Sequence, residues 1–155
     1  MSEENVELVR RSIDAFSRGD FDGVLEGFAP DALIDWSNSI GFDAGVFRGH
    51  GEMRAFLERF YEGFDDIRLE LLYGPEEVEN GFVVTENVSY SRGRDGIVVP
   101  AQSTFLTTVR DGEQTSLTLY QTRQEALEAA HAAARGGAAT LRRLWRSVRR
   151  SESGS

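Results

Sequence analysis

Residues 51–74 read GEMRAFLERFYEGFDDIRLELLYG, and the spacing of the apolar residues changes at Asp65-Asp66 within this stretch. Before that point, apolar side chains recur at i, i+3, i+4 and i+7, which predicts an amphipathic helix over residues 51–64. After it the period falls to two, which predicts a strand over residues 66–74. The chain is therefore expected to change from helices to a sheet at this point.

Upstream of residue 51 the sequence predicts two more helices. The first runs over about residues 3–18, with one apolar face formed by Val6, Val9, Ile13 and Phe16. The second is short and follows Gly19, with Asp20 as its N-cap and Pro30 at its end. A short strand over residues 33–36 and a glycine-rich loop over residues 37–51 complete the N-terminal part.

Downstream of residue 65 the sequence predicts a meander of four strands, over residues 66–74, 80–92, 97–110 and 114–123. Asn80-Gly81 and Asp111-Gly112 separate alternating segments, which is typical of tight antiparallel hairpins. An alanine-rich helix over residues 124–134 follows. Helices first and strands afterwards predict an α+β fold, with N-terminal helices packed in a cone against a curved, mostly antiparallel sheet and an added C-terminal helix.

The composition removes several kinds of chemistry. The chain of 155 residues has no cysteine, two histidines and no lysine, because all 17 basic residues are arginine. Disulfides, thiol nucleophiles and a lysine Schiff base are excluded, and no metal site or cofactor is expected. No apolar run approaches the roughly 20 residues of a membrane span, and the acidic N-terminus does not resemble a secretory signal. We expect a soluble, cytoplasmic protein.

The charge is distributed unevenly along the chain. Residues 135–155 carry six arginines and one acidic residue, Glu152, so their net charge is +5. Because the whole chain has a net charge of −9, the remaining residues carry a net charge of −14. We expect one domain over residues 1–134, a basic amphipathic helical extension over 135–150 and a disordered tail over 151–155. Because an acidic body repels the phosphate backbone, nucleic acid is not an expected partner. Contact of the extension with a membrane is a less favoured alternative to its docking on the body.

Three stretches of sequence carry a resemblance to a known family. They are Phe16-Ser17-Arg18-Gly19-Asp20-Phe21-Asp22-Gly23-Val24, Phe47-Arg48-Gly49-His50-Gly51, and Val109-Arg110-Asp111-Gly112 with residues 120–130. The last of them looks like the Tyr-x-Asp-Arg-x-Glu-Ala-Leu ending common in actinobacterial members. Over about residues 3–130 the chain resembles the SnoaL-like branch of the nuclear-transport-factor-2-like superfamily. That family includes bacterial isomerases, polyketide cyclases, epoxide hydrolases and proteins with no known reaction, so the fold alone does not select one.

The catalytic groups of these relatives are not obvious in this chain. Alignment on Gly-Asp-x-Asp-Gly with the ketosteroid isomerases puts Ser12 and Trp36 where the family has a tyrosine and an aspartate base, and puts Gln102 or Thr104 at the third position. A tryptophan cannot abstract a proton, so that isomerase chemistry is disfavoured. The remaining catalytic candidates are Glu86, Asp35 and His50. We interpret His50 first as a hydrogen-bonding residue at a helix terminus.

The expected ligand site follows from which face of the sheet is apolar. The segment over residues 80–92 offers one face with Phe82 and Val84 and another with Asn87 and Ser89, and the first is the better candidate for the core. The resulting pocket wall would consist of Trp36, Asn38, Gln102, Thr104, Leu106, Thr118 and Tyr120. Such a wall suits a small, mostly apolar molecule with one or two polar atoms.

Two kinds of function therefore remain open. The first is a cone that binds a small hydrophobic molecule and acts on it as an isomerase, cyclase or hydrolase of unknown substrate. The second is a non-catalytic domain for ligand sensing or protein interaction. A buried carboxylate facing the cavity would favour the enzyme, and neutral walls would favour the binder. We also expect a homodimer through the outer sheet face, taken to include Val99, Ala101, Ser103 and Phe105.

Overall fold

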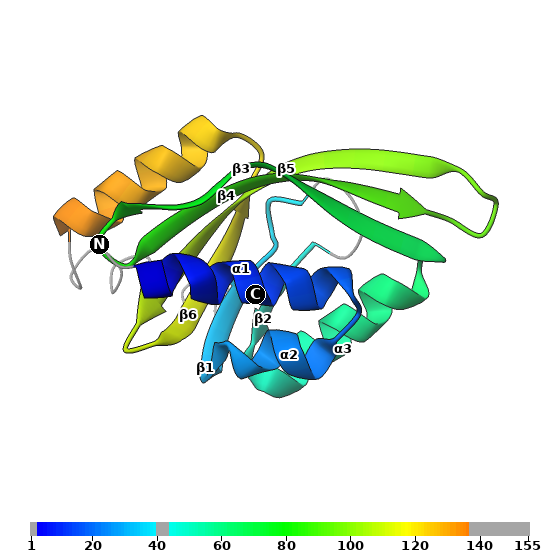
Figure 1. Cartoon of the computed structure of the whole chain (residues 1–155), viewed down its shortest axis with the longest axis horizontal. Helices are drawn as coiled ribbons and strands as arrows, with labels where there is room; N and C mark the ends of the chain where they lie inside the picture. Colours follow the sequence, from blue (N-terminus) through cyan, green and yellow to red (C-terminus); the bar gives the residue numbers. More distant parts are fainter. Residues whose placement is uncertain (1–2, 40–43, 137–155) are drawn as a thin grey trace, which may run out of the picture.

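The chain folds around one six-stranded curved sheet with helices on both of its faces (Figure 1). The computed structural model describes residues 3–39 and 44–136. In chain order the elements are α1 (Glu3–Ser17), α2 (Phe21–Glu26), β1 (Phe28–Asp35), β2 (Val46–Arg48), α3 (Gly49–Glu62), β3 (Asp66–Glu79), β4 (Phe82–Arg92), β5 (Val98–Arg110) and β6 (Glu113–Tyr120). A further helix covers residues 123–136. The predicted fold class is confirmed.

The strands lie in the order β2-β1-β6-β5-β4-β3. Strands β3 to β6 form the predicted antiparallel meander, and β1 joins its end by pairing parallel with β6. At the β5–β6 turn, Asp111 and Gly112 both have positive φ angles, 51° and 77°, which a tight hairpin of this kind requires and which the Asp-Gly pair tolerates. The parallel pairing brings the N-terminal segment and the last strand side by side.

Three helices cover the face of the sheet that we call the inner face. Helix α3 buries Met53, Phe56 and Leu57, as the spacing of its apolar residues predicts. Asp20 caps α2, because its side chain accepts a hydrogen bond of 3.0 Å from the backbone N–H of Gly23. The main core lies between these helices and β1, around Phe28 and Ile34.

The helix over residues 123–136 covers the opposite, outer face (Figure 1). Ala126 and Ala130 are fully buried and pack against Phe82, Val84 and Leu106. Because alanine has a short side chain, the helix approaches the strands closely. Both faces of β4 are therefore buried over part of its length, and an apolar face is not sufficient to identify the cavity side.

The structure differs from the sequence prediction at three element boundaries. Strand β1 begins at Phe28 rather than at residue 33, and Pro30 lies inside it, where the pairing with β6 is irregular. The predicted loop contains the short strand β2. Strand β3 continues past Gly74, which has a φ of 74° and where a Cβ would lie 2.5 Å from the carbonyl oxygen of Val84. A glycine in such a place signals an irregularity within a strand as well as a turn.

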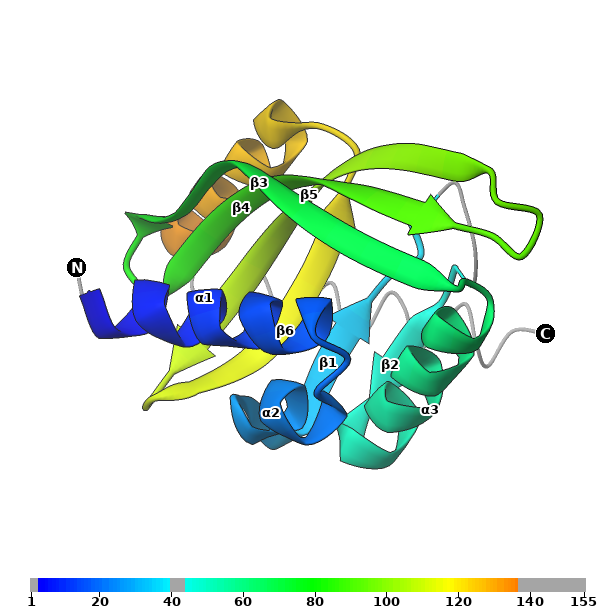
Figure 2. The same cartoon turned by 45° about the vertical axis from the view of Figure 1, so that its right-hand side comes forward.

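The β4–β5 hairpin extends beyond β6, which pairs with β5 only from Thr104 onward, whereas β3 runs beside β4 as far as Arg92 (Figure 2). Its tip exposes three consecutive apolar residues, Ile97, Val98 and Val99, each more than half exposed. Large apolar side chains of this kind gather at interaction surfaces more often than on solvated hairpins.

The C-terminal helix extends through Arg135 and Gly136, the first two residues of the predicted extension. The rest of that extension, residues 137–150, and the predicted tail over 151–155 lie outside the described residues. Within the part that is described, no helix has the length and apolar character needed to cross a membrane.

Candidate functional site

A cavity of about 110 Å³ lies between α1, α3 and the inner face of the sheet. Its volume is several times the space that one water molecule needs. Most of its lining is apolar, with α1 contributing Val9, Ile13 and Phe16. The cavity is thus formed where the helices diverge from the curved sheet.

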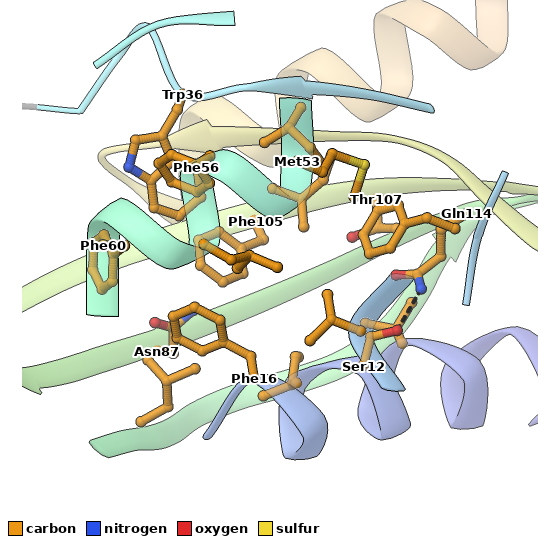
Figure 3. Close-up of a pocket in the computed structure, with 18 of the residues that line it drawn as sticks. Ser12, Phe16, Trp36, Met53, Phe56, Phe60, Asn87, Phe105, Thr107 and Gln114 are labelled. Carbon is orange, nitrogen blue, oxygen red and sulfur yellow. Dashed lines mark hydrogen bonds between the residues drawn. The ribbon is translucent and has the colours of Figure 1, made fainter. Parts of the chain in front are cut away.

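Aromatic side chains form one wall of this cavity (Figure 3). Trp36 follows Ile34 by two residues and therefore points to the same side of the sheet. Its ring centroid lies 5.4 Å from that of Phe56 on α3 and 5.4 Å from that of Phe105 on β5. Phe60 continues the wall, 6.0 Å from Phe56. Flat aromatic faces of this kind pack well against a flat apolar molecule.

A polar network closes the other end of the cavity (Figure 3). Gln114 is 1% exposed, and its side-chain nitrogen donates to the hydroxyl oxygen of Ser12 at 2.6 Å and to the carbonyl oxygen of Gly27 at 3.1 Å. These bonds satisfy the amide nitrogen inside an apolar region. The network joins β6 to α1 and to the end of α2.

Three other polar side chains on the inner face are buried and have no hydrogen-bond partner at one atom each. They are the hydroxyls of Thr85 and Thr107 and the amide nitrogen of Asn87. Asn87 and Thr107 line the cavity and are each 1% exposed. An unsatisfied buried polar group costs about 1–3 kcal/mol. The groups that lie beside the cavity can be satisfied by a water molecule or by a polar atom of a ligand.

The described residues that line the cavity are all uncharged. Their polar groups are hydroxyls and amides, from Ser12, Asn87, Ser89, Ser103 and others. Residues 3–39 and 44–136 also contain no group of three or more histidines and carboxylates suited to a metal ion. The described walls can therefore form hydrogen bonds and apolar contacts, and they add no charge.

Trp36 lines the cavity, but five residues of the predicted wall lie on the outer face: Gln102, Thr104, Leu106, Thr118 and Tyr120. The register shows this, because Asn87 pairs with Ser103 on the inner face, so that Gln102 and Thr104 point the other way. The face assignment was wrong because the helix over residues 123–136 buries the outer face as well. Of the aligned isomerase positions, Ser12 and Trp36 line the cavity and the third does not.

Glu86 also lies on the outer face, where it pairs with Arg123. Its two carboxylate oxygens accept hydrogen bonds of 3.1 Å and 3.4 Å from the guanidinium group. The guanidinium lies 4.0 Å above the ring of Tyr73, and the hydrogen bond to Glu86 raises the pKa of Arg123. This pair joins the first residue of the C-terminal helix to the sheet, away from the cavity.

Asp35, Asn38 and His50 have local structural roles. The carboxylate of Asp35 accepts hydrogen bonds from the backbone N–H and the hydroxyl of Ser37. Asn38 donates to the carbonyl oxygen of Leu119 at 3.1 Å, which ties the chain after β1 to β6. His50 lies in the first turn of α3, and its Nε2 donates to the carbonyl oxygen of Phe28 at 2.9 Å. None of the three is among the described residues that line the cavity.

The surface predicted for dimer contact also changes. Ser103 and Phe105 line the cavity rather than the outer face, and Val99 and Ala101 lie on the same strand face nearer the hairpin tip. That set of four residues is therefore not an outer surface. Pairing with a second copy of the chain stays a prediction.

Asn87 and Thr107 were not predicted from the sequence as cavity residues. Alternation along β4 places Asn87 and Ser89 on one face, but the other face is more apolar and was predicted to line the cavity. The polar side chains next to the aromatic residues Trp36 and Phe105 could have identified this face as the cavity side, because a buried face with several polar side chains is unusual outside binding sites.

The family follows from comparison with known proteins. The model of the SnoaL-like domain matches residues 9–117. The chain belongs to the SnoaL-like domain family. The matched region includes every element from α2 to β5, together with most of α1 and β6. No functionally curated protein matches this SnoaL-like chain significantly.

Solved structures share the cone fold with this SnoaL-like domain. TerC, co-crystallised with polyporic acid, is 22% identical over 81% of this chain and 99% of its own, with a TM-score of 0.66. The protein RV0760c from Mycobacterium tuberculosis, in complex with estradiol-17beta-hemisuccinate, is 16% identical over 79% and 97%, with a TM-score of 0.67. A nuclear-transport-factor-2-like protein from Burkholderia xenovorans LB400 is 26% identical over 84% and 97%, with a TM-score of 0.63.

Proposed function

We propose that this SnoaL-like cone binds a small, mostly apolar molecule in the cavity beside Trp36. The observation that carries the proposal is an apolar cavity with an aromatic wall of Trp36, Phe56 and Phe105 and with unpartnered polar groups at Asn87 and Thr107. Concave apolar sites with a few polar groups are the usual form of small-molecule sites. Two proteins of the same fold were crystallised with small molecules, polyporic acid and estradiol-17beta-hemisuccinate, which supports the proposal.

The uncharged character of the described walls favours binding over acid–base catalysis. The carboxylates considered for catalysis, Glu86 and Asp35, point away from the cavity and are engaged with Arg123 and Ser37. Binding, for ligand sensing or transfer, is thus our first candidate, ahead of an isomerase, cyclase or hydrolase.

Fluorescence of Trp36 tests the proposal. The chain has two tryptophans, so Trp145→Phe leaves Trp36 as the single reporter. Neutral two-ring aromatic compounds such as biphenyl should change its emission and raise the melting temperature at similar concentrations. In a Trp36→Phe, Trp145→Phe control the thermal stabilisation should persist and the emission change should vanish. Compounds that stabilise the protein without ever affecting Trp36 would show that they bind elsewhere.

A further inference from the structure

The positions of the unpartnered polar atoms indicate more about the ligand, given that the cavity binds one as proposed. Asn87 on β4 and Thr107 on β5 both point inward, are almost completely buried and line the same cavity. Each lacks a protein partner at one polar atom. Because they belong to different strands, they are independent contact points.

The two residues are well separated along the sheet. Thr107 pairs with Val83, and Asn87 lies four residues farther along β4. At roughly 3.3 Å per residue, their backbone positions differ by about 13 Å along the strand direction. In Figure 3, Asn87 lies toward the Trp36 end of the cavity and Thr107 toward the Gln114 end. A single polar group on a small molecule cannot reach both.

Each contact point suits an uncharged oxygen atom. The Oδ1 atom of Asn87 already faces the hydroxyl of Ser103 at 3.5 Å, so the amide nitrogen remains to donate. With the amide turned around, an acceptor would face the cavity instead, and a ligand hydroxyl satisfies either arrangement. The hydroxyl of Thr107 both donates and accepts.

The described walls do not favour a charged ligand. A carboxylate or an ammonium group would lose its hydration there without a side chain of opposite charge among the described lining residues. Burying an unpaired charge is far more costly than burying a hydroxyl that finds a hydrogen bond.

We propose that the ligand is an uncharged, elongated aromatic or alicyclic molecule with a hydroxyl or carbonyl oxygen at each of two separated positions. One oxygen contacts Asn87, the other contacts Thr107, and the apolar body between them packs against Trp36 and Phe105. Asn87 and Thr107 are then the residues that determine specificity in this site.

A matched series of probes tests the proposal on the full chain with Trp145→Phe. The series is biphenyl, 4-hydroxybiphenyl, 4,4′-dihydroxybiphenyl and biphenyl-4,4′-dicarboxylate, with binding measured by Trp36 emission and by calorimetry. Each added hydroxyl should tighten binding several-fold, so that the dihydroxy probe binds at least ten-fold more tightly than biphenyl. The dicarboxylate should bind no more tightly than biphenyl.

Two nearly isosteric variants then assign the contacts. Asn87→Leu and Thr107→Val should each remove most of the gain from one hydroxyl, so that the affinity of the dihydroxy probe relative to biphenyl falls several-fold. Thr104→Val is the matched control, because Thr104 is a buried threonine on β5, the strand of Thr107, and points to the opposite face. It should leave the whole series unchanged.

The possible failures are distinguishable. If biphenyl binds and the hydroxyls add nothing, or if neither variant changes their effect, the two-point proposal is wrong while the proposed function stands. If the dicarboxylate binds most tightly, the uncharged ligand class is wrong. If no probe binds or perturbs Trp36, the proposed function fails and this inference fails with it. Should Asn87→Leu not fold, Thr107→Val and its control decide alone.

Discussion

The side-chain nitrogen of Gln114 donates a hydrogen bond of 2.6 Å to the hydroxyl oxygen of Ser12, although 102 residues separate them in the chain. The same nitrogen reaches the carbonyl oxygen of Gly27, which also accepts from the backbone N–H of Gln114 at 2.9 Å. One buried amide thus joins three elements at the closed end of the cavity. It is a direct hydrogen-bonded link between α1 and the sheet.

Replacing this amide should weaken the fold. In Gln114→Leu the hydroxyl of Ser12 loses its partner in a buried place, and the apolar side chain cannot replace the bonds. We expect the free energy of unfolding to fall by about 2–4 kcal/mol in urea titrations. Glu113→Gln, an exposed change on the same strand, is the control and should be nearly neutral. Equal stability of both variants would contradict this role for Gln114.

The pair between Glu86 and Arg123 should hold the C-terminal helix on the outer face. In Arg123→Ala the buried carboxylate of Glu86 loses its cation, so the first turns of the helix should open more often. Hydrogen exchange should speed up several-fold for the amides of residues 124–136 and remain unchanged in α1. Arg110→Ala, another exposed arginine, is the control.

Since Glu86 points away from the cavity, Glu86→Gln should leave the binding of the biphenyl probes intact. Loss of that binding would argue against the assignment of Glu86 to the outer face.

The sequence predicted the parts of this fold that depend on local chemistry. Three predicted features rest on contacts within a few residues, and all three appear in the structure. They are the helical spacing of apolar residues over 51–64, the cap at Asp20 and the turn at Asp111-Gly112. The extent of β1 and β3 depends instead on their partner strands, which is why Phe28 and the residues after Gly74 were placed incorrectly.

The candidate site was harder to predict, because it depends on which face of the sheet the N-terminal helices cover. The alternation of side chains along β4 puts Glu86 and Asn87 on opposite faces of the sheet, but it does not show which of the two residues points inward. The apolar residues Phe82 and Val84 favoured the wrong face, because the helix over residues 123–136 buries them there. Only the positions of α1 and of that last helix on opposite faces resolve the ambiguity.

Tyr61 should make the fold sensitive to alkaline pH. Its hydroxyl donates to the carbonyl oxygen of Phe16, and burial raises its pKa above the ordinary value of about 10. Its protonated form therefore stabilises the fold fully below that ordinary value, and this contribution is lost as the pH rises through the higher folded-state value. Tyr61→Phe should lower stability by about 1 kcal/mol at pH 7 and reduce the loss above pH 10.

Unfolding curves between pH 7 and pH 11 measure this effect, with tyrosine ionisation followed by absorbance. Tyr90→Phe, on the outer face of β4, serves as the control and should retain the wild-type dependence. If Tyr61→Phe and wild type lose stability in parallel above pH 10, then Tyr61 does not contribute the effect.

The hairpin tip should take part in self-association. Ile97, Val98 and Val99 are exposed together on a projecting hairpin, and covering them with a second copy would remove apolar surface from water. We expect a dimer by light scattering at micromolar concentration, and Val98→Glu should shift it toward monomer without changing the melting temperature of dilute protein. A wild-type monomer under these conditions would exclude the predicted homodimer.

The basic C-terminal segment should bind the acidic body of its own chain. The described residues of this helix end at Gly136, and beside them lies a groove whose lining includes Ala133, Ala134, the acidic residues Glu79 and Asp111 and the basic residue Arg110. Residues 137–155 carry five arginines against one glutamate, whereas the rest of the chain is strongly acidic, and the segment is tethered at high effective concentration. Deleting residues 137–155 should therefore lower the melting temperature, and the difference from the full chain should shrink in high salt because added ions screen the attraction. Binding to anionic liposomes should change little. If deletion leaves the melting temperature unaltered and abolishes liposome binding, the segment is a membrane contact instead.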